Sequence, residues 1–182
     1  AIVDDRGLVR PVSNGKAELT IQSEDQKLSV PIEVTGMTDP QPVSFRNEIM
    51  PILTKARCNS GGCHGKAEGQ NGFKLSIFGF DVASDYQSLV MESRGRRVMP
   101  LTPEQSLLYL KGSARLPHGG GRKIEPGSYR DRLMLRWISE GARLDDDDNE
   151  VARIVKIEIE PTEQILFAGE SQQIRVTAIE AA

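Results

Sequence analysis

Alternating apolar and polar residues mark both ends of the chain as β-structure. Near the N-terminus, "KAELTIQ" and "KLSVPIEV" alternate or run apolar, and a short polar stretch separates them. Near the C-terminus, "RIVKIEIEP" and "QQIRVTAIE" show the same period of two. Because successive side chains of a strand point to opposite faces, this pattern predicts strands with one apolar face. Segments 1–38 and 147–182 are therefore predicted to be β segments.

The middle of the chain, 39–146, has the period of a helix instead. Apolar residues recur every three or four positions between Phe45 and Ala56, behind Ser44, which can cap a helix N-terminus. The period continues past Pro51, so this residue is expected to kink the helix and not to end it. The turn-prone "DPQP" and the acidic "DDDDN" mark the two boundaries of this segment.

Further helices are predicted at about 82–92, 103–112 and 128–140. The second of these opens with "TPEQ", where Thr102 and Gln105 would form a capping box. The last is the clearest, because Ser128 can cap it, Gly141 can end it, and Trp137 lies on its apolar line. The apolar stretch "GFKLSIFGF" is expected to be extended.

Composition and charge exclude several classes of function. The 182 residues are 38% apolar and 27% charged, and the net charge of −3 does not suggest binding to nucleic acid. No apolar run approaches the roughly 20 residues that span a bilayer. The chain begins in the middle of a pattern and without a signal peptide, so we expect a fragment of a longer protein. Aromatic residues make up only 5%, which leaves room for a planar cofactor in the core.

The motif "CNSGGCH" (58–64) contains both cysteines and one of the two histidines. A disulfide between Cys58 and Cys63 would close a very short loop and would gain little stability. A zinc site would use these cysteines with His64 and His118, but the adjacent Cys63 and His64 would both have to point at one ion.

Covalent haem is the interpretation that the motif favours. Two thiols can form thioethers with the haem vinyl groups, and the imidazole directly after the second thiol can ligate the iron. The spacer of four residues is longer than the usual two, but its small, turn-tolerant residues can bulge outward. Cys58, Cys63 and His64 are therefore the predicted attachment and ligand residues for haem c.

The middle segment resembles a known family, the planctomycete-type cytochrome c domain. "FRNEIMPILTKARCNSGGCHGKAEGQNGFKLSIFGFD", "RRVMP", "SLLYLKGSARLPHGGGRKI" and "YRDRLMLRWISEGA" carry the resemblance, which covers about 43–143. It implies a mainly α, cytochrome c-like haem domain within a large exported protein. The flanks resemble halves of bacterial immunoglobulin-like modules, and we expect them to pair with each other as a β-sandwich, within one chain or between two.

The second iron ligand is expected to be His118, with Met99 as the alternative. His118 lies about ten residues before the last predicted helix, where small cytochromes c carry this ligand, and a run of glycines follows it. Arg96 and Arg97 are candidates to pair with the haem propionates. The acidic run 145–148 is expected to be a solvated linker, with a cation site as the alternative.

Together these features predict electron transfer by a covalently bound c-type haem. Two protein ligands leave no position for a substrate, so the domain is expected to be an electron carrier with a redox partner protein and not an enzyme. The expected location is outside the cytoplasm, in the periplasm or at the cell surface. The alternatives are a peroxidase-like haem enzyme with an open or displaceable second ligand, and a structural module stapled by zinc or a disulfide.

Overall fold

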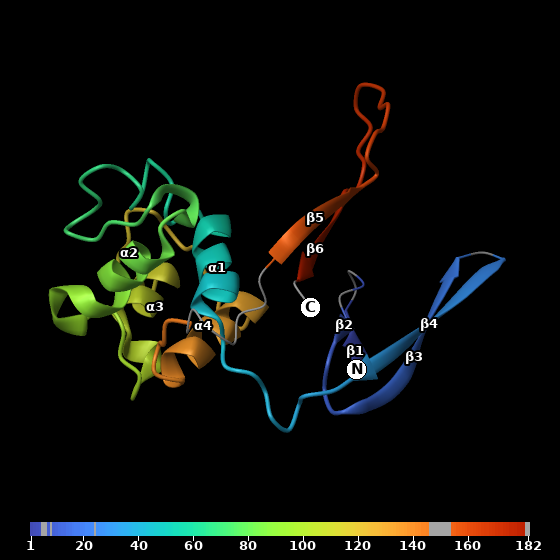
Figure 1. The fold of residues 1–182 in the computed structure, drawn as a ribbon, viewed down its shortest axis with the longest axis horizontal. Coiled ribbons are helices and arrows are strands. Elements are labelled where there is room, and N and C mark those ends of the chain that lie inside the picture. The colour runs from blue at the N-terminus through green and yellow to red at the C-terminus, as the bar shows by residue number, and fades with distance from the viewer. Residues whose placement is uncertain (5–6, 8, 24, 146–153, 181–182) are drawn as a thin grey trace. The chain divides into compact units, whose positions relative to one another are not determined.

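The fold is described by a computed structural model that covers residues 1–4, 7, 9–23, 25–145 and 154–180 (Figure 1). The chain divides into two units, Ala1–Pro42 and Val43–Ala182. The first unit ends close to the boundary predicted after residue 38. The second predicted boundary, between residues 146 and 147, lies outside the described residues.

The N-terminal unit consists of two antiparallel pairs of strands. The short strands β1 (Ile2–Val3) and β2 (Val9–Arg10) form one pair. The longer β3 (Gly15–Ser23) and β4 (Gln26–Val34) form the other, and they correspond to the two predicted strands. Leu19 lies opposite Val30 in this register, so an apolar row occupies one face of the hairpin.

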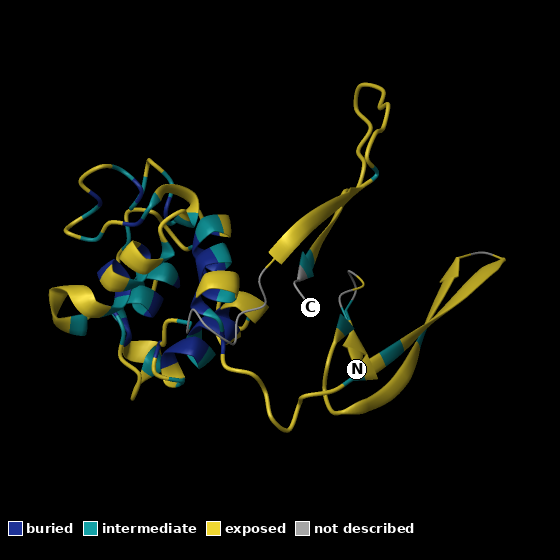
Figure 2. Cartoon of the chain, viewed as in Figure 1, coloured by how far each residue is buried: buried dark blue, intermediate teal, exposed yellow. Residues whose placement is uncertain are grey.

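The C-terminal segment is a third hairpin. It contains β5 (Ile154–Glu160) and β6 (Arg175–Glu180), which pair antiparallel with an irregularity between Ile154 and Lys156. Both strands were predicted, and both are confirmed. Every residue of β5 is exposed, as the yellow colour of this hairpin in Figure 2 shows.

The predicted immunoglobulin-like sandwich is wrong. The described strands form three separate two-stranded sheets, and no ladder joins the N-terminal flank to the C-terminal flank. Strands that are close in sequence pair through a short loop, which costs less chain entropy than pairing across more than a hundred residues. The alternating pattern gives the strands correctly, but it contains no information on a partner sheet.

The first helix of Val43–Ala182 forms as predicted. It starts as a π-helical turn, η1 (Phe45–Ile49), and continues as α1 (Met50–Lys55). Ser44 caps it, since its hydroxyl accepts a hydrogen bond from the N–H of Asn47 (2.9 Å). Pro51 is the second residue of α1, and helical structure continues on both sides of it.

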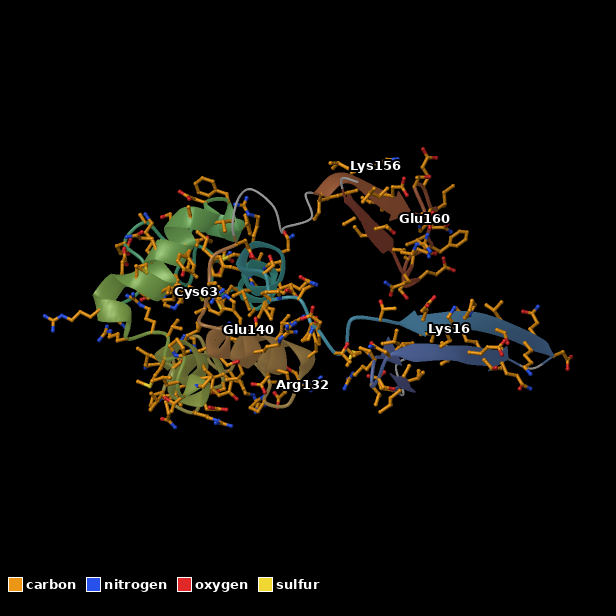
Figure 3. All side chains as sticks on the ribbon, turned by 60° about the horizontal axis from the view of Figure 1, so that its bottom comes forward. Lys16, Cys63, Arg132, Glu140, Lys156 and Glu160 are labelled. Carbon is orange, nitrogen blue, oxygen red and sulfur yellow. The ribbon has the colours of Figure 1, made fainter. Side chains whose placement is uncertain are left out.

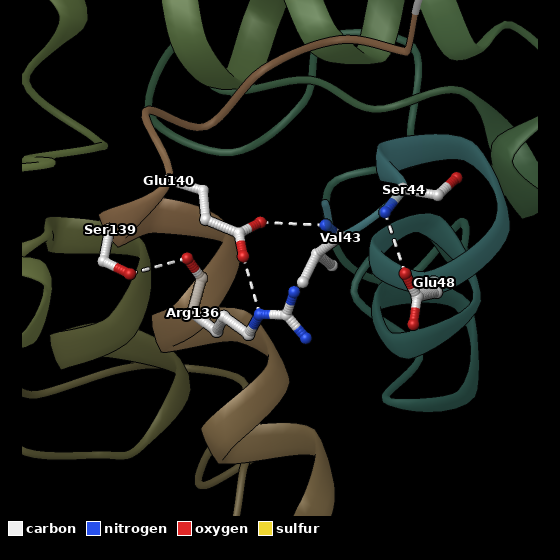
Figure 4. Close-up of polar contacts among 6 residues, drawn as sticks. All are labelled: Val43, Ser44, Glu48, Arg136, Ser139 and Glu140. Atoms are coloured by element: carbon white, nitrogen blue, oxygen red, sulfur yellow. Dashed lines mark hydrogen bonds and ion pairs between the residues drawn. The ribbon is translucent and has the colours of Figure 1, made fainter. Parts of the chain in front are cut away.

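Acidic side chains from the other end of this region also hold the start of the helix. Glu140 accepts a hydrogen bond from the N–H of Val43 (2.8 Å) and pairs with Arg136 (2.6 Å), as Figure 4 shows. Asp145 accepts hydrogen bonds from the N–H groups of Phe45 and Arg46. Asp145 is therefore a capping residue, whereas the rest of the acidic run, 146–148, lies outside the described residues.

The remaining helical elements are short. They are η2 (Ile77–Gly79), α2 (Val82–Tyr86), η3 (Gln87–Met91), η4 (Glu92–Gly95), η5 (Pro103–Gln105), α3 (Leu107–Gly112) and α4 (Tyr129–Ser139). The helix predicted at 82–92 is present as α2 and η3. The predicted capping box is wrong, because the Thr102 side chain makes no cap hydrogen bond and Ser106 separates η5 from α3.

The core of this region joins the first and last helices. Ser128 caps α4 as predicted, and Leu133, Met134, Trp137 and Ile138 on α4 are buried. Trp137 lies against Phe45, as expected for two helices that pack at these positions. Figure 2 shows the buried residues gathered in this helical part of the chain.

The expectation of a mainly α, cytochrome c-like fold is also wrong. The structure contains 29% helix and 22% strand, and even α4, the longest α-helix among the described residues, has only 11 residues. Positive φ angles at Arg57, Phe78 and Ser93 interrupt the backbone where an uninterrupted helix would need negative values. The stretch 72–80 is not a strand: it contains η2, and Phe78 and Phe80 are exposed. No described helix has the length and apolar character to cross a membrane.

Candidate functional site

A cavity of about 690 Å³ brings together the residues that the sequence singled out. Both cysteines and both histidines line it: Cys58, Cys63, His64 and His118. Leu53, Leu75 and Leu89 contribute apolar walls, and all three are buried. The volume lies within the range of about 300–1,000 Å³ that is typical of small-molecule and cofactor sites.

A tight turn after α1 places the two cysteines and His64. The N–H of Cys63 donates to the carbonyl of Ser60 (2.9 Å), and the N–H of His64 donates back to the carbonyl of Cys58 (3.0 Å). The spacer residues Gly61 and Gly62 are exposed, and Gly62 also lines the cavity. Gly65 is required at its position, because a Cβ there would lie 2.2 Å from the carbonyl oxygen of Asn59.

Both cysteines are free thiols, and both are half-buried (Figure 3 marks Cys63). Burial raises the pKa of the Cys58 thiol to about 11, although the nearby Lys123 ammonium acts in the opposite direction. At neutral pH the Cys58 sulfur is therefore protonated and weakly nucleophilic.

His64 is held in a fixed orientation. Its Nδ1 lies 3.0 Å from the carbonyl oxygen of Phe73, and its ring centroid lies 4.5 Å from that of Phe73. An Nδ1–H that donates to a carbonyl leaves Nε2 with a free lone pair, which is the usual arrangement of a metal-ligating histidine. Burial lowers the pKa of His64 below its usual value, so the ring is neutral at pH 7.

His118 has the same arrangement on the loop between α3 and α4. Its Nδ1 lies 2.9 Å from the carbonyl oxygen of Gly121, so its Nε2 is also available. The rings of His64 and His118 are nearly parallel, with 10° between their planes and 6.3 Å between their centroids.

This separation fits two imidazoles that ligate one metal ion from opposite sides. A metal–nitrogen bond is about 2 Å long and the nitrogen lies about 1 Å from its ring centroid, which predicts centroids about 6 Å apart. A closed zinc site does not form, since no group of three or more His, Cys, Asp or Glu converges among the described residues. His64, His118 and the two cysteine thiols of the cavity wall instead fit a haem. The two histidines would ligate its iron, and the two thiols would bind the edge of the porphyrin ring.

Met99, the alternative second ligand, does not line the cavity. Its side chain is 47% exposed, and its backbone N–H donates to the hydroxyl of Ser106 (2.9 Å). Of the two candidates, only His118 lies across the cavity from His64.

Among the described residues, the charged side chains that line the cavity are basic: Arg96, Arg97, Lys111 and Lys123. Arg97 is buried, and its guanidinium donates to the carbonyls of Ser88 and Gly72, both at 2.7 Å. Arg96 is exposed at the same wall. A cavity with this lining attracts an anionic ligand, although the chain as a whole is acidic.

Three residues of the site were not predicted from the sequence. Phe73 belongs to the stretch that was expected to be extended, and Lys111 and Lys123 flank the loop of His118. No short motif contains them, because their contacts depend on how irregular loops fold: Phe73 contacts His64, and Lys111 contacts Pro117.

Comparison of the chain with protein-family models, with curated proteins and with solved structures finds no match. The interpretation of the site therefore rests on its geometry.

Proposed function

We propose that this chain binds haem c covalently and transfers single electrons. Cys58 and Cys63 would hold the haem by thioether bonds, and His64 and His118 would be the iron ligands. The observation that supports this most directly is the pair of nearly parallel imidazole rings, 6.3 Å apart, across a cavity whose wall contains both thiols. Bound haem would supply an iron that gains and loses one electron reversibly.

The iron ligands and the residues that line the cavity would set the reactivity and the reduction potential of the bound haem. Two histidine ligands leave no position for a substrate, which favours an electron carrier and not an enzyme. The buried Leu53, Leu75 and Leu89 would give the haem an apolar wall. Two imidazoles also give a lower reduction potential than a histidine and a methionine, because a thioether favours reduced iron.

The basic wall would receive the haem propionates. Arg96, exposed at the wall, can donate to a carboxylate, and the fixed charge of Arg97 adds to the attraction even though two of its donors are already used. The resemblance to a domain of exported proteins supports a location in the periplasm or at the cell surface, within a larger protein and with a redox partner protein.

Production of the chain in a bacterial periplasm together with a cytochrome c maturation system tests the proposal. We expect a red protein with a Soret band, a mass increased by one haem, and colour that stays with the chain after acid–acetone extraction. Cys58→Ala with Cys63→Ala should abolish covalent attachment. A colourless product with a disulfide between the two cysteines would overturn the proposal.

The identity of the second ligand can be tested on the same material. His118→Ala should change the spectrum of the ferric protein, whereas Met99→Ala should leave it unchanged. A long-wavelength band typical of methionine ligation, lost in Met99→Ala, would contradict the assignment of His118.

A further inference from the structure

Backbone hydrogen bonds connect both ends of the loop that contains His118 to the end of α3. The N–H of Leu116 donates to the carbonyl of Leu110 (3.0 Å). On the far side, the N–H groups of Lys123 and Ile124 both donate to the carbonyl of Gly112, at 2.8 and 2.9 Å. The two ends of the loop are therefore fixed on one turn of helix.

Lys111, on the same turn of α3, makes the hydrogen bond to this loop that lies closest to His118 in sequence. Its ammonium donates to the carbonyl of Pro117, the residue directly before His118, at 2.5 Å. The proline ring fixes φ of Pro117, so a bond to its carbonyl orients the peptide that enters His118. Within the loop, the N–H of Gly121 then donates to the carbonyl of His118 (2.9 Å).

The two histidines differ in what holds their rings. His64 is held by Phe73, which belongs to a separate segment and contributes both a hydrogen bond and a ring contact. The hydrogen bond of the His118 ring goes to Gly121, within its own loop. A Cβ built on Gly119 or on Gly121 meets nothing within 4 Å, whereas one built on Gly120 would lie 3.1 Å from the His118 ring and 3.2 Å from the Lys123 side chain. The orientation of His118 therefore depends on how the loop is anchored.

We propose that Lys111 is a positioning residue that holds His118 parallel to His64. Without it, the His118 side of the cavity becomes open to a small external ligand such as cyanide. This inference rests on the proposed function, because it assumes that His118 and the external ligand compete for the same position. The distance from Lys111 to Pro117 and the parallel rings are its structural basis.

Cyanide titration of the ferric haem protein tests the role of Lys111. We expect Lys111→Met to bind cyanide at least tenfold more tightly than the unaltered protein, as followed by the Soret band. Loss of a positive charge alone would weaken binding of an anion, so tighter binding reports on the loosened loop. Lys111→Arg keeps a donor and should restore the original affinity. Lys55→Met, a change at an exposed lysine of α1, should have no effect.

A measurement on the haem-free chain separates failure of this inference from failure of the proposed function. Hydrogen exchange at the N–H groups of Leu116 and Gly121 should be faster in Lys111→Met than in Lys111→Arg. Unchanged exchange and unchanged cyanide affinity in a protein that does attach haem would overturn the role of Lys111 alone. Absence of covalent haem would overturn the proposed function, and the exchange data would still decide whether Lys111 holds the loop.

Discussion

The indole ring of Trp137 stacks on the ring of Phe45, with centroids 5.3 Å apart and 29° between the ring planes. Both side chains are at most 1% exposed. The indole N–H also donates to the carbonyl of Arg143 (3.0 Å). The pair connects the first helix of the helical region to the last, and its packing holds the two ends of this region together.

We expect Trp137→Ala to lower the free energy of unfolding by about 3–5 kcal/mol, the usual cost of removing a buried aromatic side chain. Trp137→Phe keeps an aromatic ring against Phe45 and loses only the indole hydrogen bond and some volume, so it should cost less. Urea unfolding followed by far-UV circular dichroism measures both. Equal losses in the two variants would show that the ring contact is not what stabilises this region.

Periodic patterns predicted the elements whose residues interact along one face. The apolar line that ends at Trp137 on α4 and the strands β3 to β6 are of this kind, because the period identifies residues on the same face of a helix or strand. The break at Ser106 and the left-handed backbone of Phe78 have no such pattern. The missing sandwich has a similar cause, since strands define a face and do not specify what covers it.

The candidate site was partly predictable for a different reason. Cys63 and His64 are adjacent, so any chemistry that uses one tends to involve the other, and His118 was the only other histidine. The hydrogen bond from Lys111 to the carbonyl of Pro117 depends on the exact path of a loop. A lysine six residues before a proline is not a motif, so this contact could be found only from the structure.

Alkylation should reveal the raised pKa of Cys58. A shift from 9.0 to about 11 lowers the thiolate fraction at pH 8 by about 100-fold, and the thiolate is the reactive form. In the haem-free Cys63→Ser variant, Cys58 should therefore react with iodoacetamide about 100-fold more slowly in buffer than in urea. Mass spectrometry gives both rates. Similar rates in the folded and unfolded chains would contradict the burial of Cys58.

Asp85 should make stability depend on pH in a direction that is unusual for a carboxylate. It is buried and accepts hydrogen bonds from the backbone N–H and the hydroxyl of Ser76, and burial, the larger effect, raises its pKa from 3.8. The folded chain then holds the proton more tightly than the unfolded chain. Its stabilising contribution is complete below the unfolded pKa and is lost as pH rises through the folded pKa.

Asp85→Asn removes this titration and keeps an oxygen that can accept from the N–H of Ser76. Relative to the variant, the unaltered protein should lose stability as pH rises above 3.8, the ordinary pKa of an aspartate. Urea unfolding at several pH values measures the difference. A difference that is constant across these pH values would mean that Asp85 titrates at the same pH in the folded and unfolded chains.

Asp145 should behave as a helix cap and not as part of a solvated linker. Its two carboxylate oxygens accept from the N–H groups of Phe45 and Arg46, at 3.0 and 2.6 Å, at the start of the first helix. At the start of a helix the helix itself generally supplies no acceptor for the first N–H groups, and loss of a cap there costs about 1 kcal/mol. We expect Asp145→Ala to lower the free energy of unfolding by about this amount, and Asp145→Asn, which keeps one acceptor, to cost less.

The exposed Asp39 provides the matched control, since Asp39→Ala also removes one negative charge and should change stability by less than about 0.5 kcal/mol. Urea unfolding of the three variants at one pH compares them directly. If Asp145→Ala and Asp39→Ala lowered the free energy of unfolding by the same small amount, the carboxylate of Asp145 would contribute only its charge. That result would agree with the expectation that the acidic run is a solvated linker. A larger loss for Asp145→Ala would show that the end of the helical region stabilises its beginning, and that a residue which the sequence assigns to a linker belongs to the folded domain.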